Sequence, residues 1–138
     1  MRHRMTLAVV GAVFTLAAAA SAETAKPAAD KHARGKYLVE RAGMCQDCHT
    51  PRTRDGGFDK NNWLLGGSLG MKPLAPMPWM PVAPPIAGLP TLTHEQAVHF
   101  LMTGERPGKP RVTPPMPEYR FSREDAEAIA AFLKSLAK

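Results

Sequence analysis

Apolar residues recur at helical spacing in three segments of the chain. In the first segment, residues 31–42, the regularly spaced small and apolar positions are Gly35, Leu38, Val39 and Ala42. Leu38, Val39 and Ala42 lie three, four and seven positions after Gly35, so all four would share one face of a helix. Asp30 is the expected N-cap of this helix, and Gly43 is expected to end it. A glycine inside a helix is unfavourable by about 1 kcal/mol relative to alanine, which predicts close packing against another helix at Gly35.

Two further segments carry clear helix boundaries. Residues 94–103 follow Thr93, whose hydroxyl can cap the helix while Gln96 reaches back to it. Residues 123–137 follow Ser122 and have two acidic residues in the first turn, where the helix dipole favours negative charge. No segment has the convincing alternation of a strand, so we expect an all-α fold of about three main helices.

The stretch between the first two helices is unusually rich in proline and glycine. The chain contains 14 prolines and 11 glycines, and many of them fall in residues 51–90. A loop this long without secondary structure is uncommon, because its backbone polar groups need partners. We therefore expect it to wrap around a large group that is not protein.

The N-terminus has the pattern of a secretory signal peptide. Two arginines within the first four residues precede an uncharged run, Met5–Ala22, which ends in the small-residue sequence Ala-Ser-Ala. An uncleaved membrane anchor is the alternative, although a run of 18 residues is near the short limit for crossing a bilayer. We expect cleavage after Ala22, which makes residues 1–22 the signal peptide and residues 23–138 one mature domain without a membrane span. Such export predicts an oxidising compartment, the periplasm of a bacterium.

The net charge of the chain adds little to the prediction of its function. Without residues 1–22 the chain would keep 16 basic and 12 acidic residues, a net charge of about +4. No clustered basic run is present, which argues against nucleic-acid binding. A modest basic excess suits acidic protein partners, and we expect the mature chain to be a monomer.

The sequence Cys45-Gln46-Asp47-Cys48-His49 contains both cysteines of the chain. This C-x-x-C-H pattern is typical of c-type haem attachment, in which both thiols bond to the porphyrin edge and the adjacent histidine ligates the iron. A redox disulfide would need a thioredoxin-like βαβ setting, which the pattern lacks. A structural zinc site would need four protein ligands, usually from a second Cys or His pair at close spacing. Neither alternative accounts for the histidine, so we expect one covalent haem c.

Beyond this motif, the sequence resembles the class I cytochromes c over nearly all of residues 23–138. The matching segments are Gly35–Leu38 (GKYL), Pro84–Leu89 (PPIAGL) and Pro114–Pro117 (PPMP). Residues 48–67 look like a bacterial periplasmic subgroup with an enlarged haem-wrapping loop. The resemblance implies a class I cytochrome c fold and electron transfer on the haem, with His49 as one axial ligand of the iron.

The second axial ligand is expected to be a methionine, because thioether sulfur is a common partner of histidine in cytochromes c and raises the reduction potential. Met116 is the favoured candidate. Prolines at positions 114, 115 and 117 restrict its backbone, and its place before the last helix matches the family motif. Met77 and Met80, in the long loop, remain alternatives, as does a histidine or an open site.

Further haem contacts follow from the resemblance. It implies that the Pro84 carbonyl accepts a hydrogen bond from His49 and that Ile86 packs on the porphyrin. The Pro85 carbonyl is the alternative acceptor. Buried propionates need hydrogen-bond donors. The candidate donors are Arg52, Trp63 and Trp79. The alternative for both tryptophans is a place in the core.

These features favour an electron carrier over an enzyme. With both axial positions filled, the iron could not bind a substrate, and a peroxidase would need an open iron face. Multi-haem enzymes would need further C-x-x-C-H motifs, whereas this chain has one. We expect redox partner proteins, such as a dehydrogenase, an oxidase or another cytochrome. The alternative is a haem c subunit permanently bound to a periplasmic dehydrogenase or oxidase, whose electron chemistry would be identical.

Overall fold

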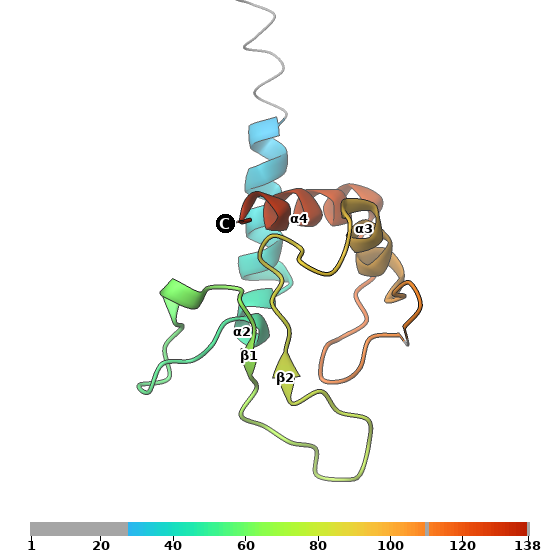
Figure 1. Cartoon of the computed structure of the whole chain (residues 1–138). Coiled ribbons are helices and arrows are strands. Elements are labelled where there is room, and N and C mark those ends of the chain that lie inside the picture. The colour runs from blue at the N-terminus through green and yellow to red at the C-terminus, as the bar shows by residue number, and fades with distance from the viewer. Residues whose placement is uncertain (1–27, 110, 138) are drawn as a thin grey trace, which may run out of the picture.

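The fold was analysed in a computed structural model that describes residues 28–109 and 111–137 (Figure 1). The predicted signal peptide and its cleavage site lie outside these described residues. Residues 28–37 are α-helical and run directly into a π-helical segment. The named elements, in chain order, are η1 (Leu38–Ala42), α2 (Cys45–His49), η2 (Lys60–Asn62), β1 (Gly67–Ser68), β2 (Val82–Ala83), α3 (His94–Thr103) and α4 (Arg123–Ser135). The predicted all-α class is confirmed.

The first helix differs from its prediction at both ends. Asp30 is not its N-cap, because residues 28–30 are already helical. At the other end the Gly43 N–H donates to the Leu38 carbonyl five residues earlier, over 2.7 Å, in place of the four-residue spacing of an α-helix. This wider turn rotates the following residues around the axis. Ala42, predicted on the inner face, is therefore exposed, while Leu38 and Val39 are buried as expected.

Gly35 marks the place where the first helix crosses α4. A Cβ atom at Gly35 would overlap the carbonyl oxygen of Ala128, so only glycine allows this approach. The predicted close helix contact is confirmed. Two ion pairs flank the crossing, Lys31 with Glu127 at 2.9 Å and Arg34 with Asp125 at 2.8 Å.

The predicted boundaries of the other two helices are largely correct. In α3 the Thr93 hydroxyl accepts from the Gln96 N–H, and the Gln96 side chain accepts from the Thr93 N–H, which completes the capping box. In α4 the Ser122 hydroxyl accepts from the Asp125 N–H. This helix ends at Ser135, two residues earlier than predicted. α4 packs against both α3 and the first helix, and Val39, Leu101 and Ile129 are buried in the core that these helices share.

The proline-rich stretch contains two very short strands that the sequence did not predict. β1 and β2 pair antiparallel, with Gly67 opposite Ala83 and Ser68 opposite Val82. The chain between them forms a long loop that projects away from the helices (Figure 1). None of the helices in the described part of the chain is long and apolar enough to cross a membrane.

Candidate functional site

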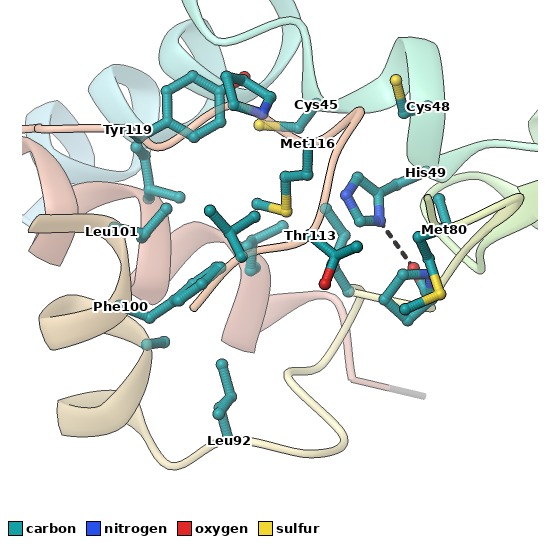
Figure 2. Close-up of a pocket in the computed structure, with 18 of the residues that line it drawn as sticks. Cys45, Cys48, His49, Met80, Leu92, Phe100, Leu101, Thr113, Met116 and Tyr119 are labelled. Carbon is teal, nitrogen blue, oxygen red and sulfur yellow. Dashed lines mark hydrogen bonds between the residues drawn. The ribbon is translucent and has the colours of Figure 1, made fainter. Parts of the chain in front are cut away.

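A cavity with an almost entirely apolar lining opens between the helices and the loops (Figure 2). Its walls come from α2, from residues 83–92, from α3 and α4, and from the loop that precedes α4. The lining residues with sulfur or imidazole groups are Cys45, Cys48, His49, Met80 and Met116, with Met44 at the turn into α2. An apolar cavity that gathers two thiols, an imidazole and thioethers is suited to a large, flat, mostly apolar ligand with a metal at its centre.

α2 brings the two cysteines and the histidine of the motif together. Met44 adopts the left-handed conformation, with φ at 48°, and so turns the chain sharply between η1 and α2. α2 is a little more than one helical turn long, which places positions 45, 48 and 49 on neighbouring sides of it. The Gln46 side chain donates to the Glu40 carbonyl over 3.1 Å and ties this turn to the first helix. The thiols of Cys45 and Cys48 are not joined in a disulfide.

His49 is buried, and its Nδ1 lies 2.7 Å from the Pro84 carbonyl oxygen. A carbonyl can only accept, so Nδ1 carries the proton and donates. Burial lowers the pKa of the imidazole, against the smaller opposing effect of this hydrogen bond, and so favours the neutral ring. Nε2 then keeps its lone pair, and Figure 2 shows it turned away from Pro84, toward the side of the cavity where Met116 lies. This is the tautomer that a metal-ligating histidine needs.

The Pro84 carbonyl is held in place by its neighbours in the loop. The Leu64 carbonyl accepts from the Ile86 N–H over 2.9 Å, and the His49 carbonyl accepts from the Gly66 N–H over 2.8 Å. Gly66 has φ at +84°, a conformation that side chains other than glycine rarely adopt. Residues 64–66 therefore connect the segment that follows Pro84 to the end of α2, and Ile86 lines the cavity beside them.

Met116 projects into the cavity from the loop before α4 (Figure 2). Among the alternatives, Met80 also lines the cavity, but its side chain lies at the edge, beyond the hydrogen bond between His49 and Pro84. Met77 is exposed and is not part of the lining. The backbone of the Met80 loop is joined to the Met116 loop, because the Met80 N–H donates to the Pro114 carbonyl over 2.8 Å.

Tyr119 is a cavity residue that the sequence analysis missed. Its hydroxyl donates to the Gly43 carbonyl, which links the Met116 loop to the turn before Cys45. Its ring stacks on Phe121 with 4.9 Å between ring centres, and burial raises the pKa of its hydroxyl to about 12. Burial also raises the pKa of the Cys45 thiol to about 11. The available signal was an aromatic residue three positions after Met116 in a segment rich in proline.

Arg52 and Trp63 are not brought to the cavity. The Arg52 guanidinium lies over the ring of Phe58, 4.0 Å from its centre. Trp63 packs against the core, and its indole N–H donates to the side chain of Gln46 over 3.3 Å. Trp79 donates to the Met71 carbonyl, also outside the lining. The position of Trp63 agrees with the alternative that it is a core residue. The arginine that does line the cavity, among the described residues, is Arg106.

The donor set fits the iron of a haem better than other metals. The described residues contain no group of three or more histidine, cysteine or carboxylate side chains that could hold a metal ion. One imidazole and one thioether in an apolar cavity match the axial ligands of a cytochrome c, and two thiols beside them match covalent attachment.

Comparison with known proteins agrees with this geometry. The sequence profile of the family described as Cytochrome c matches residues 32–137, which include the whole cavity. A protein of Cereibacter sphaeroides described as "Diheme cytochrome c-type" is 54% identical over 39 residues. That alignment covers 28% of this chain and 13% of the relative, so the chain matches only a small part of that protein's length. Proteins of the matched family carry haem c covalently and transfer electrons on it. The chain belongs to the cytochrome c family.

Proposed function

We propose that this chain carries one electron at a time on a single haem c in a bacterial periplasm. In this proposal Cys45 and Cys48 hold the haem covalently, and His49 and Met116 are the axial ligands of its iron. The haem supplies a one-electron couple that the protein alone lacks. The cavity residues supply attachment, ligands and an apolar surrounding that tunes the potential.

One observation supports the ligand assignment above the others. His49 donates from Nδ1 to Pro84 and is left with a free lone pair on Nε2, while Met116 enters the same cavity from a different loop. A histidine held in this way cannot turn to another partner without losing a hydrogen bond in an apolar setting. The two candidate ligands are therefore held by separate segments of the fold.

An iron with both axial positions filled has no open coordination position for a substrate. Its ligands also stay the same between the two oxidation states, which suits rapid electron transfer. The lining of the cavity offers few polar groups that could bind water. These properties favour a carrier over an enzyme.

The remaining parts of the proposal rest on the sequence. One C-x-x-C-H motif provides one attachment site, although the relative named above is described as diheme. Residues 1–22 have the signal-peptide pattern, so we propose export and a mature chain that begins at Glu23.

Intact mass spectrometry of the protein isolated from the periplasmic fraction tests these claims together. We expect the mass of residues 23–138 plus one haem, and haem that stays with the protein in acidified acetone. Cys45→Ala or Cys48→Ala should sharply lower the yield of holoprotein, because the fold loses the group that fills its cavity. Haem that extracts freely from the wild-type protein would contradict covalent attachment. A mass that includes residues 1–22, found in the membrane fraction, would contradict cleavage.

A further inference from the structure

The loop between β1 and β2 concentrates the exposed apolar side chains of the molecule. We call residues 69–83, which comprise this loop and the strand β2 that follows it, the apolar loop. Eight large hydrophobic residues are exposed in the described chain, and five of them lie within this loop. These five are Met71, Leu74, Met77, Met80 and Val82. Leu74 is fully exposed and covers no other apolar surface. Soluble proteins rarely expose such a group of residues unless it binds something.

Charged residues are almost absent from the apolar loop and from its flanks in the sequence. Residues 61–93 contain one charged side chain, Lys72, and no carboxylate. The basic residues elsewhere are partly neutralised, as in the pairs of Arg34 with Asp125 and of Arg111 with Glu118. The net charge therefore does not describe this surface. A partner that meets it would need an apolar face more than an acidic one.

The apolar loop is held in shape although it projects from the body. The Leu69 N–H donates to the Pro81 carbonyl over 3.0 Å, and the Trp79 indole N–H donates to the Met71 carbonyl over 3.3 Å. Four prolines, at positions 73, 76, 78 and 81, restrict the backbone further. Binding to a loop that is already ordered loses less conformational entropy than binding to a flexible one.

The apolar loop is also a wall of the cavity. Leu69, Met80 and Ala83 line the cavity, and Met80 as a whole residue is at the same time 43% exposed. A protein bound over Met80 would therefore contact a residue that also lines the cavity. This position suits a partner that exchanges electrons with a group inside the cavity.

We propose that the apolar loop is the docking face for a redox partner protein that presents an uncharged apolar patch around its own redox centre. This inference rests on the proposed electron-carrier function. A membrane surface is the competing occupant, but segments that bind membranes usually carry several basic residues, whereas this loop has one. Methionine and tryptophan are also enriched at the centres of protein interfaces.

The test uses matched substitutions of exposed residues in the full holoprotein. Leu74→Gln and Met77→Gln, alone and together, remove apolar surface from the loop without touching the cavity lining. Tyr37→Gln is the control, because Tyr37 is a comparably exposed large side chain on the first helix. Ferrous holoprotein is mixed in stopped flow with the cell-envelope fraction of the source bacterium from which this gene has been deleted. Hexacyanoferrate(III), a small oxidant that needs no protein docking face, is the second oxidant.

When the concentration of the cytochrome limits the rate, we expect the envelope fraction to oxidise the double variant about tenfold more slowly than wild type. A tenfold decrease corresponds to the loss of about 1.4 kcal/mol of binding free energy. Tyr37→Gln should match wild type, and raising the salt from 0.01 to about 0.15 M should change the wild-type rate little. Equal rates for the double variant and wild type would overturn the docking proposal. The proposal would also be overturned if the wild-type protein bound vesicles of phosphatidylethanolamine and phosphatidylglycerol and the double variant did not. Failure of hexacyanoferrate to oxidise any of the proteins would instead contradict the carrier function itself.

Discussion

Arg111 and Glu118 form a bidentate ion pair across the loop that carries Met116. Arg111 Nε lies 2.9 Å from Glu118 Oε1, and Nη2 lies 3.2 Å from Oε2. Arg111 also donates to the Thr103 carbonyl over 2.7 Å and to Glu105 over 3.0 Å. The two ends of the Met116 loop are thus fixed to each other and to the C-terminal end of α3.

Removal of this ion pair should loosen the hold on Met116. In Arg111→Gln we expect the near-infrared band of sulfur bound to ferric iron to disappear at a lower urea concentration than in wild type. The reason is that this variant lacks the contacts of Arg111 that join the two ends of the Met116 loop. Arg120→Gln is the matched control, because Arg120 is more exposed and makes one longer contact to Glu118, at 3.4 Å. Equal midpoints for both variants would show that the pair does not position the ligand.

The axial assignment itself can be tested by truncating methionines one at a time. Met116→Ala should abolish the near-infrared band, let cyanide bind the ferric protein, and lower the potential as water or a harder ligand replaces sulfur. Met80→Ala, at the cavity edge, and Met77→Ala, outside it, should keep the band. A band that survives in Met116→Ala and is lost in Met80→Ala would assign the ligand to Met80.

Arg106, rather than Arg52, should influence the haem potential. Arg106 lines the cavity, whereas Arg52 lies over Phe58 outside it. A positive charge near the iron favours the reduced state, which carries one positive charge fewer. Arg106→Gln should therefore lower the midpoint potential in a redox titration, and Arg52→Gln should leave it nearly unchanged. The opposite result would restore Arg52 as the residue near the haem.

Tyr119 should ionise only in strongly alkaline solution. Its pKa is raised from 10.0 to about 12, so its hydroxyl stabilises the fold most fully below pH 10 and loses this contribution as the pH rises toward 12. A phenolate cannot donate to the Gly43 carbonyl, so the link to the Met116 loop is then lost. Tyrosinate absorbance in a Tyr37→Phe variant isolates this group and should show a midpoint near 12. A midpoint near 10 would contradict the buried position of Tyr119.

The contact between Gly35 and α4 predicts the effect of one added methyl group. Gly35→Ala gains helix propensity of about 1 kcal/mol, but the methyl group would overlap the backbone of Ala128, which cannot move aside. We expect the overlap to dominate and to destabilise the protein by about 1–3 kcal/mol in urea unfolding. Gly57→Ala is the control, because its nearest neighbour is the side chain of Thr53, at 3.1 Å. Equal stability of the two variants would mean that the helices can separate freely.

Features encoded by neighbouring residues could be predicted from the sequence. The capping box of Thr93 and Gln96 and the N-cap of Ser122 depend on residues within one helical turn, and both are present. The attachment motif is likewise a local pattern, and the family resemblance found with it is confirmed by the profile match.

Features set by distant contacts could not be predicted in the same way. The π-helical turn at Leu38 has no signal in its own sequence, and a strand of two residues is too short to show alternation. Arg52 and Trp63 are candidate donors to the propionates by their chemistry, but their positions depend on how the long loop folds over α2 and the core. The role of Tyr119 became visible only when its loop was placed beside Gly43.

The crossing at Gly35 also determines the order in which this molecule can be completed. Gly35 and Ala128 are 93 positions apart, so the first helix finds its main partner only after α4 has been synthesised. Ile129 and Leu133 of α4 form part of the cavity wall, and the cavity stays open until they arrive. Until then the two thiols at positions 45 and 48 are accessible, so under the proposed function a haem could be attached to them before the fold encloses them. Such an arrangement would separate in time the chemistry that joins a haem from the packing that buries it.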